Sequence, residues 1–243
     1  MGVFLAVKFP GDSDRTAIIG SSGSGKTTAA AWLLASYDFT TRPYVIVNTK
    51  DDPLIAEIAA IPGVHVITLD ETPNEPGLYI VNPLPHEQEA LNAFFQRIWE
   101  RGETTVWVDE GYMIEITDAF NALLTQGRSR KIAVIVLSQR PAWISKFVFS
   151  EASFVQVFRL GHLDDRKNIA KFVPMDPKGR LPNYHSYWYN VNANEIVRFS
   201  PVPPKASIIN SFRAKFPPNE AQQAGPAGPL IVEEKSVRRI RVV

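Results

Sequence analysis

Cysteine is absent from this 243-residue sequence, and histidine occurs only four times. The first absence excludes disulfide scaffolds and thiolate metal sites, and it fits a reducing compartment. The histidines are scattered along the chain without the spacing of a metal-binding motif. We therefore expect no metal site built from cysteine or histidine side chains.

Long hydrophobic runs and a dominant charge are missing as well. No stretch approaches the roughly 20 consecutive apolar residues that a membrane span requires, and Lys8 interrupts the N-terminal segment before a signal-peptide core could form. Lys and Arg number 26 against 25 Asp and Glu, which gives a formal charge of +1. We expect a soluble, cytoplasmic protein in which any nucleic-acid contact comes from local patches or from an assembled ring.

The chain does contain enough apolar material for a core, at 45% hydrophobic residues. Short β-branched and aromatic runs alternate with helical patterns, which predicts an α/β fold around a mostly parallel sheet flanked by helices. The predicted strands are Val3–Lys8, Thr16–Ile19, Tyr44–Asn48, Val64–Thr68, Thr105–Val108, Ile132–Ser138 and Phe154–Leu160. The predicted helices are Lys26–Ser36, Pro53–Ala60, Glu87–Arg101, Ile116–Gln126 and Asp164–Lys171.

The C-terminal part differs in composition. Tyr184–Tyr189 and Glu195–Ser200, joined by an Asn-rich turn, predict a hairpin. From Pro201 onward, prolines and glycines predict an extended tail without regular elements. We expect one domain over residues 1–200 and a tail over 201–243. The tail ends in a small basic cluster of Lys235, Arg238, Arg239 and Arg241.

A glycine-rich segment after the second predicted strand carries the first chemical signal. It satisfies GxxxxGK[ST], the Walker A pattern, between an apolar strand and a helical run. Glycines let successive backbone N–H groups point at phosphate oxygens, at the positive end of the helix. Lys26 then reaches the β and γ phosphates, and the Thr27 hydroxyl binds Mg²⁺. The predicted nucleotide-binding residues are Gly20, Ser21, Ser22, Gly23, Ser24, Gly25, Lys26, Thr27 and Thr28.

A second, acidic motif follows the strand Thr105–Val108. Asp109 is expected to hold the Mg²⁺ ion, and Glu110 to deprotonate the attacking water, as in a Walker B motif. Two adjacent carboxylates with different tasks suit a hydrolase better than a kinase. Gln139, at the end of Ile132–Ser138, is expected to sense the γ phosphate or the water.

The order of these motifs along the chain indicates which class of P-loop NTPase the sequence resembles. Two predicted strands lie between the phosphate loop and the acidic strand. This insertion resembles the RecA-like, catalytic-glutamate division of P-loop ATPases, in which the two motif strands are not neighbours in the sheet. No NKxD-like guanine reader stands out, so ATP is the expected nucleotide.

Further residues resemble one family. Gly127-Arg128-Ser129-Arg130 leads into the strand that ends in Ser138-Gln139-Arg140-Pro141, a pattern similar to that of the FtsK/HerA superfamily of DNA-pumping ATPases. The resemblance covers roughly residues 13–172. A compact chain of this kind is similar to the genome-packaging ATPases of tailless, internal-membrane viruses. The resemblance implies a homohexameric ring around double-stranded DNA, located in the host cytoplasm or the virion, with capsid-vertex or membrane-associated viral proteins as further partners.

In such rings, an arginine of the neighbouring subunit completes the ATP site. Arg128 and Arg130 are the candidates, with Arg159 and Arg140 in reserve. Lys146 and Lys50 are candidates for the DNA-facing pore. The hairpin aromatics are expected either to stack on bases or to cover a sheet edge, and they are Tyr184, Tyr187, Trp188 and Tyr189.

Two other functions fit parts of the pattern. An assembly or secretion ATPase of the same superfamily, of the filamentous-phage morphogenesis type, would act on protein but usually carries a membrane segment. An ATP-dependent switch or transporter subunit would share the phosphate loop, but no LSGGQ-like signature precedes Asp109.

Overall fold

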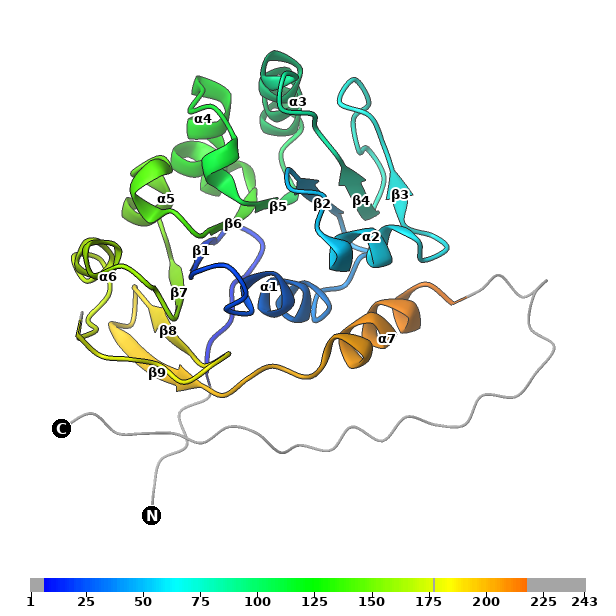
Figure 1. The fold of residues 1–243 in the computed structure, drawn as a ribbon. Coiled ribbons are helices and arrows are strands. Elements are labelled where there is room, and N and C mark those ends of the chain that lie inside the picture. The colour runs from blue at the N-terminus through cyan, green and yellow to red at the C-terminus, as the bar shows by residue number, and fades with distance from the viewer. Residues whose placement is uncertain (1–6, 177, 218–243) are drawn as a thin grey trace, which may run out of the picture.

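The computed structural model describes residues 7–176 and 178–217. Helices cover both faces of one central sheet (Figure 1). The strands are β1 (Arg15–Ile19), β2 (Pro43–Asn48), β3 (His65–Val66), β4 (Gly77–Val81), β5 (Thr105–Asp109), β6 (Ala133–Ser138), β7 (Phe154–Phe158), β8 (Ser186–Asn190) and β9 (Glu195–Phe199). The α-helices are α1 (Lys26–Leu34), α2 (Pro53–Ala59), α3 (Gln88–Arg101), α4 (Asp118–Gln126), α5 (Phe147–Ser150), α6 (Leu163–Ile169) and α7 (Lys205–Lys215). Short 3₁₀ turns are η1 (Gly111–Met113), η2 (Gly127–Arg130) and η3 (Pro141–Trp143).

The sheet has the strand order β3-β4-β2-β5-β6-β1-β7-β8-β9. Strands β3 to β7 in this order pair in parallel, whereas β8 and β9 join as an antiparallel hairpin. The predicted α/β fold and the C-terminal hairpin are therefore confirmed. Strand β6 lies between β1 and β5, as expected for motif strands that are not neighbours.

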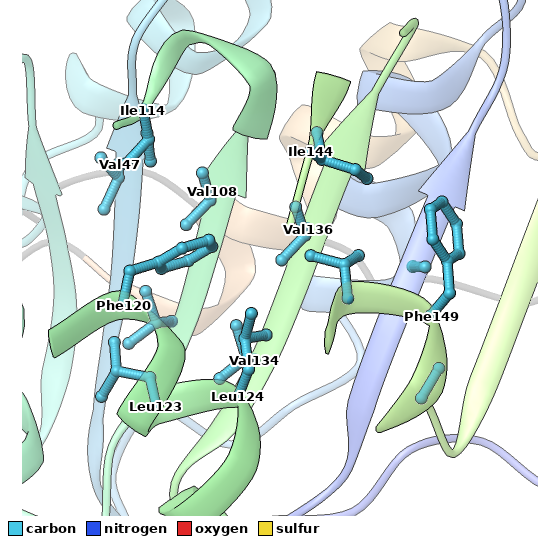
Figure 2. Close-up of a cluster of buried hydrophobic side chains, with 14 of the residues drawn as sticks. Val47, Val108, Ile114, Phe120, Leu123, Leu124, Val134, Val136, Ile144 and Phe149 are labelled. Atoms are coloured by element: carbon cyan, nitrogen blue, oxygen red, sulfur yellow. The ribbon is translucent and has the colours of Figure 1, made fainter. Parts of the chain in front are cut away.

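Successive side chains of a strand point to opposite faces of the sheet, so the apolar strands contribute to a core on each face. Val45 and Val47 of β2 join the cluster beneath α3 and α4, while Ile46 between them joins the cluster against α1 and α2. Figure 2 shows the first cluster, in which Phe120 and Leu123 of α4 lie over Val108 and Val134 of the sheet. Burial on both faces explains why these strands are almost continuously apolar.

Two strands differ from the sequence prediction. β4 was not predicted, although its apolar run Leu78–Val81 is buried in the sheet. The strand predicted at Val64–Thr68 shrinks to the two exposed residues of β3 at the sheet edge. Of the strand predicted at Val3–Lys8, residues 1–6 lie outside the described residues, and Val7 and Lys8 are in no strand.

The region after Pro201 contains a helix, so the expectation of no regular element there is wrong. Helix α7 begins directly after Pro204, and it buries Ile208, Ile209 and Phe212. It packs against α1 and α2. Proline is well tolerated just before a helix, because the first N–H groups need no intrahelical acceptor. The rest of the predicted tail, 218–243, lies outside the described residues.

Parallel strands bring their carboxyl ends to one edge of the sheet. The segments that follow β1, β2, β5, β6 and β7 therefore meet there. These segments contain the glycine-rich loop, Lys50, the two carboxylates, Gln139 and Arg159. Crevices at this edge are where open α/β sheets bind ligands.

Candidate active site

The glycine-rich loop runs from the end of β1 to the start of α1. Gly23 and Gly25 have φ values of 69° and 100°, which favour glycine. Gly20 has no room for a side chain, because a Cβ there would lie 2.6 Å from the Phe158 Cβ. The backbone conformation and the close packing of the loop therefore require glycine at these positions. The loop ends at the N-terminus of α1, where the helix dipole favours a bound anion.

Neighbouring strands fix this loop. The Gly20 N–H donates to the Ser138 carbonyl over 3.2 Å, and Ser21 donates to the Arg159 carbonyl through both its N–H and its hydroxyl, over 3.0 and 2.9 Å. The loop is therefore attached both to the end of β6, directly before Gln139, and to the end of β7.

Asp109 lies at the end of β5, close to the start of α1. The Thr27 hydroxyl donates to its Oδ1 over 3.4 Å. Its Oδ2 is buried and has no hydrogen-bond partner among the residues that the structure describes. Burial first, and then the charges of Asp52 and Glu110, raise the pKa of Asp109 to about 7. A hydroxyl and a carboxylate with one unused oxygen fit a hard divalent cation, which prefers oxygen ligands.

Glu110 is only 2% exposed and has contacts at both carboxylate oxygens. Oε1 lies 3.5 Å from the Lys26 Nζ and 3.4 Å from the Lys50 Nζ. Oε2 accepts the backbone N–H of Gln139 over 3.0 Å. Burial lowers the pKa of Lys26, and the nearby Glu110 opposes that shift. The side chain is thus held at the mouth of the loop by two cations and one peptide group.

Gln139 extends this arrangement to Tyr112, and both residues are half-buried. Its side-chain amide donates to the Tyr112 hydroxyl over 2.8 Å, and Tyr112 belongs to the turn η1 directly after Glu110. The predicted sensor is therefore connected to the predicted base both through its backbone and through its side chain.

Lys50 is the member of this site that sequence reasoning missed, since it was predicted to face DNA. Its side chain is 41% exposed, but its ammonium group reaches Glu110. The available signal was its position, two residues after β2, because every parallel strand ends at the same edge. Thr49, beside it, donates its hydroxyl to the Asp109 carbonyl.

Comparison with known proteins identifies the family. No family model matches the chain. The DNA packaging ATPase P9 of Enterobacteria phage PRD1 is 40% identical over 222 residues, which cover 86% of this chain and 96% of P9. The chain belongs to the family of this DNA packaging ATPase.

Solved structures agree with the fold of a packaging ATPase. The genome packaging NTPase B204 of Sulfolobus turreted icosahedral virus 2, solved with AMP, has a TM-score of 0.63 at 18% identity, over 80% of this chain and all of B204. EssC (ATPases 2 and 3) of Geobacillus thermodenitrificans has a TM-score of 0.60 at 14% identity, over 84% of this chain and 44% of EssC. Among residues 7–176 and 178–217, no helix is long and apolar enough to cross a membrane.

The arginines predicted to act across a packaging-ATPase ring lie away from the loop of their own chain. Arg128 and Arg130 are in η2, which precedes β6 and so lies at the opposite edge of the sheet. Arg130 donates to the carbonyls of Trp99 and Glu100 and lies over the Trp99 ring at 4.4 Å. Arg128 is exposed.

The two reserve arginines lie at the edge that carries the loop. Arg159 is beside the loop of its own chain, where its side chain donates to Asn183 over 2.9 Å. Arg140 follows Gln139, and its guanidinium lies 5.3 Å from the centre of the Trp143 ring.

The residues predicted to contact DNA separate into two groups. Lys146 and Tyr184 are exposed, so both are free to meet a ligand. Trp188 and Tyr189 are buried at 2% and 8% exposure, and Tyr187 is half-buried. For Trp188, the packing role is the observed one, because it stacks on Phe154 and Phe199.

Proposed function

We propose that this protein is an ATP-hydrolysing motor that translocates double-stranded DNA and packages a viral genome into a preformed capsid. The observation that carries the proposal is the convergence of Lys26, Asp109 and Glu110 beside a loop shaped for phosphate. Membership in the family of a DNA packaging ATPase supports DNA as the substrate. The fold also matches EssC, but likeness of fold alone does not assign a substrate.

The nucleotide is ATP in this proposal. Its phosphates lie against the N–H groups of Gly20–Thr28, and Lys26 contacts the β and γ phosphates. B204 has been solved with ATP-γS and with AMP, which supports a nucleotide in the equivalent fold. Thr27 and the unused oxygen of Asp109 would hold Mg²⁺. When bound, that ion neutralises charge that develops on the transferring phosphoryl group.

Glu110 is the base of the reaction. Its carboxylate accepts a proton from the attacking water, whose oxygen forms the new bond to the γ phosphorus while the bond from that phosphorus to the β–γ bridging oxygen breaks and ADP leaves with the electron pair. Gln139 holds Glu110 through its N–H, and its side chain passes the change in the site to the half-buried Tyr112.

Several further features belong to the same proposal. The working form is a homohexameric ring around DNA, with Arg128 or Arg130 reaching the site of the next subunit. The motor acts in the host cytoplasm or on the virion, where capsid-vertex or membrane-associated viral proteins would anchor it. Residues 1–200 form the ATPase domain and 201–243 its C-terminal extension, with α7 packed back onto the domain.

The test is the steady-state ATPase rate with and without double-stranded DNA, in Mg²⁺ at moderate salt. We expect turnover that DNA stimulates. Lys26→Ala should lose both nucleotide binding and turnover, whereas Glu110→Gln should bind ATP without hydrolysing it. Unchanged turnover in Lys26→Ala would overturn the phosphate site. Good turnover that DNA does not stimulate would favour a protein substrate.

A further inference from the structure

Tyr184 lies in the turn just before the C-terminal hairpin, and it differs from the aromatic residues of the hairpin itself. Its side chain is 57% exposed, whereas Trp188 and Tyr189 a few residues later are buried. Its backbone has φ of 61°, in the left-handed region that a bulky residue rarely adopts. Strained positions of this kind cluster at ligand sites, because the fold must hold them against their preference. The exposed ring and the left-handed backbone of Tyr184 therefore indicate a role in ligand binding.

The ring of Tyr184 lies against the phosphate loop. A Cβ on Gly25 would be 3.3 Å from its Cδ1. A hollow of about 110 Å³ opens between the ring and the loop, and it is lined by Gly23, Ser24, Arg159, Asn183 and Tyr184. The ring thus lies beside the loop at its Cδ1 atom, while more than half of the residue's surface stays available to a ligand.

Two contacts tie the Tyr184 segment to the loop. The Arg159 carbonyl accepts both hydrogen bonds of Ser21, and the Arg159 guanidinium donates to the Oδ1 of Asn183 over 2.9 Å. Asn183 precedes Tyr184 in the chain, so phosphate loop, Arg159 and aromatic ring form one connected unit. A larger cavity of about 350 Å³ adjoins it at Arg159, and its lining includes Arg166, Met175 and Tyr187.

We propose that Tyr184 stacks on the nucleobase of the ATP whose phosphates lie in the loop. The inference rests on the proposed ATP site and adds the residue that holds the nucleoside. A nucleotide with its phosphates at Gly20–Thr28 leaves its base within a few ångströms of the loop, where Tyr184 offers a flat ring.

Stacking also predicts the selectivity of the site. Every nucleobase has a π face, so an aromatic platform binds bases with little discrimination among them. Tyr184 should thus distinguish a nucleotide from a bare triphosphate and contribute little to the choice between ATP and GTP.

The experiment compares the dissociation constants of Mg-ATP and Mg-tripolyphosphate by calorimetry. Tyr184→Ala should weaken ATP binding about tenfold and leave tripolyphosphate binding unchanged. Tyr184→Gly should show the same loss. Glycine adopts a positive φ without strain, so an equal effect in both variants would come from loss of the ring and not from a change in backbone strain. Tyr184→Phe is the matched control, and it should bind both ligands like the wild type because the ring is kept.

Two results would overturn the inference. One is unchanged ATP binding in Tyr184→Ala, and weaker DNA binding in the same variant would then assign the ring to DNA. The other is an equal loss for ATP and tripolyphosphate, which would make Tyr184 a support of the loop. Wild-type protein that binds neither ligand would instead overturn the ATP site itself, so the two failures are distinguishable.

Discussion

At the scale of single residues, the site is governed by how Glu110 is held. Lys26 and Lys50 both lie within 3.5 Å of its Oε1. Lys26 is expected to turn towards the phosphates once nucleotide binds, and this leaves Lys50 as the cation at Oε1. In the proposed mechanism Lys50 would therefore position Glu110 as the base, although it was predicted from the sequence as a DNA contact.

Lys50→Ala should lower kcat about tenfold or more and leave the KM for ATP nearly unchanged, because a base that is misplaced by about 1 Å costs rate rather than binding. The measurement is steady-state kinetics with saturating DNA, with Lys167→Ala on the surface as a control. A higher KM at normal kcat would place Lys50 on the nucleotide. Loss of DNA stimulation alone would return it to the pore.

The buried Asp109 predicts a pH dependence of stability in protein free of nucleotide and metal. Its pKa is raised from 3.8 to about 7 by burial, so the folded state holds this proton more tightly than the unfolded state. Unfolding then releases a proton, and the free energy of unfolding falls as pH rises through that window. The Asn side chain of Asp109→Asn cannot ionise. The free energy of unfolding of this variant, relative to that of the wild type, should therefore be higher at pH 8 than at pH 5.

Urea unfolding at both pH values measures this difference, with the exposed Asp164→Asn as the control that should show little change between them. An Asp109→Asn effect of the same size at pH 5 and pH 8 would mean that Asp109 titrates normally in the folded state.

The sequence pattern around each strand end made the phosphate loop and the acidic residues of the site predictable. The loop, Asp109, Glu110 and Gln139 each stand directly after an apolar strand, so their convergence followed from the parallel sheet alone. The position of Lys50 after β2 predicted that it lies at this edge, but its pairing with Glu110 joins segments 60 residues apart and could not be predicted from that position alone. Arg159 directly follows the parallel strand β7, so its place at this edge was predictable as well, whereas the position of Tyr184 depends on how the chain returns to pair β8 with β7, which is equally non-local.

At the scale of elements, α7 shows how a helix can be hidden in a proline-rich segment. Prolines before Lys205 and after Phe216 dominate the composition, but the residues between them carry apolar side chains at helical spacing. Phe212 is fully buried and stacks on Phe39 with ring centres 5.9 Å apart. β4 was missed for a related reason, since its short run lies between Pro76 and Pro83.

Phe212→Ala should destabilise the protein by about 3–5 kcal/mol, because it opens a cavity between α7 and the body of the domain. Arg213→Ala, on the exposed side of the same helix, should change stability by about 0.5 kcal/mol or less. Thermal or urea unfolding of both variants gives the comparison. Equal, small effects would show that α7 detaches from the domain in solution.

At the scale of the whole molecule, the edge with the loop and the edge with η2 are at opposite ends of the sheet. One chain therefore cannot bring Arg128 to its own Glu110, but a ring can bring it to the next subunit's site. Arg130 is the weaker candidate, because its guanidinium is engaged with the carbonyls at the end of α3.

Mixed rings test this arrangement. Arg128→Ala and Glu110→Gln should each be nearly inactive, yet co-assembled at equal amounts they should regain about a quarter of the wild-type rate, since random mixing places an intact arginine beside an intact base at that share of interfaces. Lys26→Ala mixed with Glu110→Gln is the control and should stay inactive, because both defects lie in one chain's half of the site. An active Arg128→Ala, or an inactive mixture, would remove Arg128 from this role.

The hydrogen bond from the Gln139 N–H to Glu110 has a consequence for genetics. A peptide group is present whatever side chain occupies position 139, and proline alone would delete this donor. An alanine substitution at position 139 would therefore measure only the loss of the side-chain contact with Tyr112. It would not measure the contribution of the main-chain hydrogen bond to Glu110. A replacement of the side chain at position 139 would lose the contact with Tyr112, while the main-chain N–H of that position kept its hydrogen bond to Glu110.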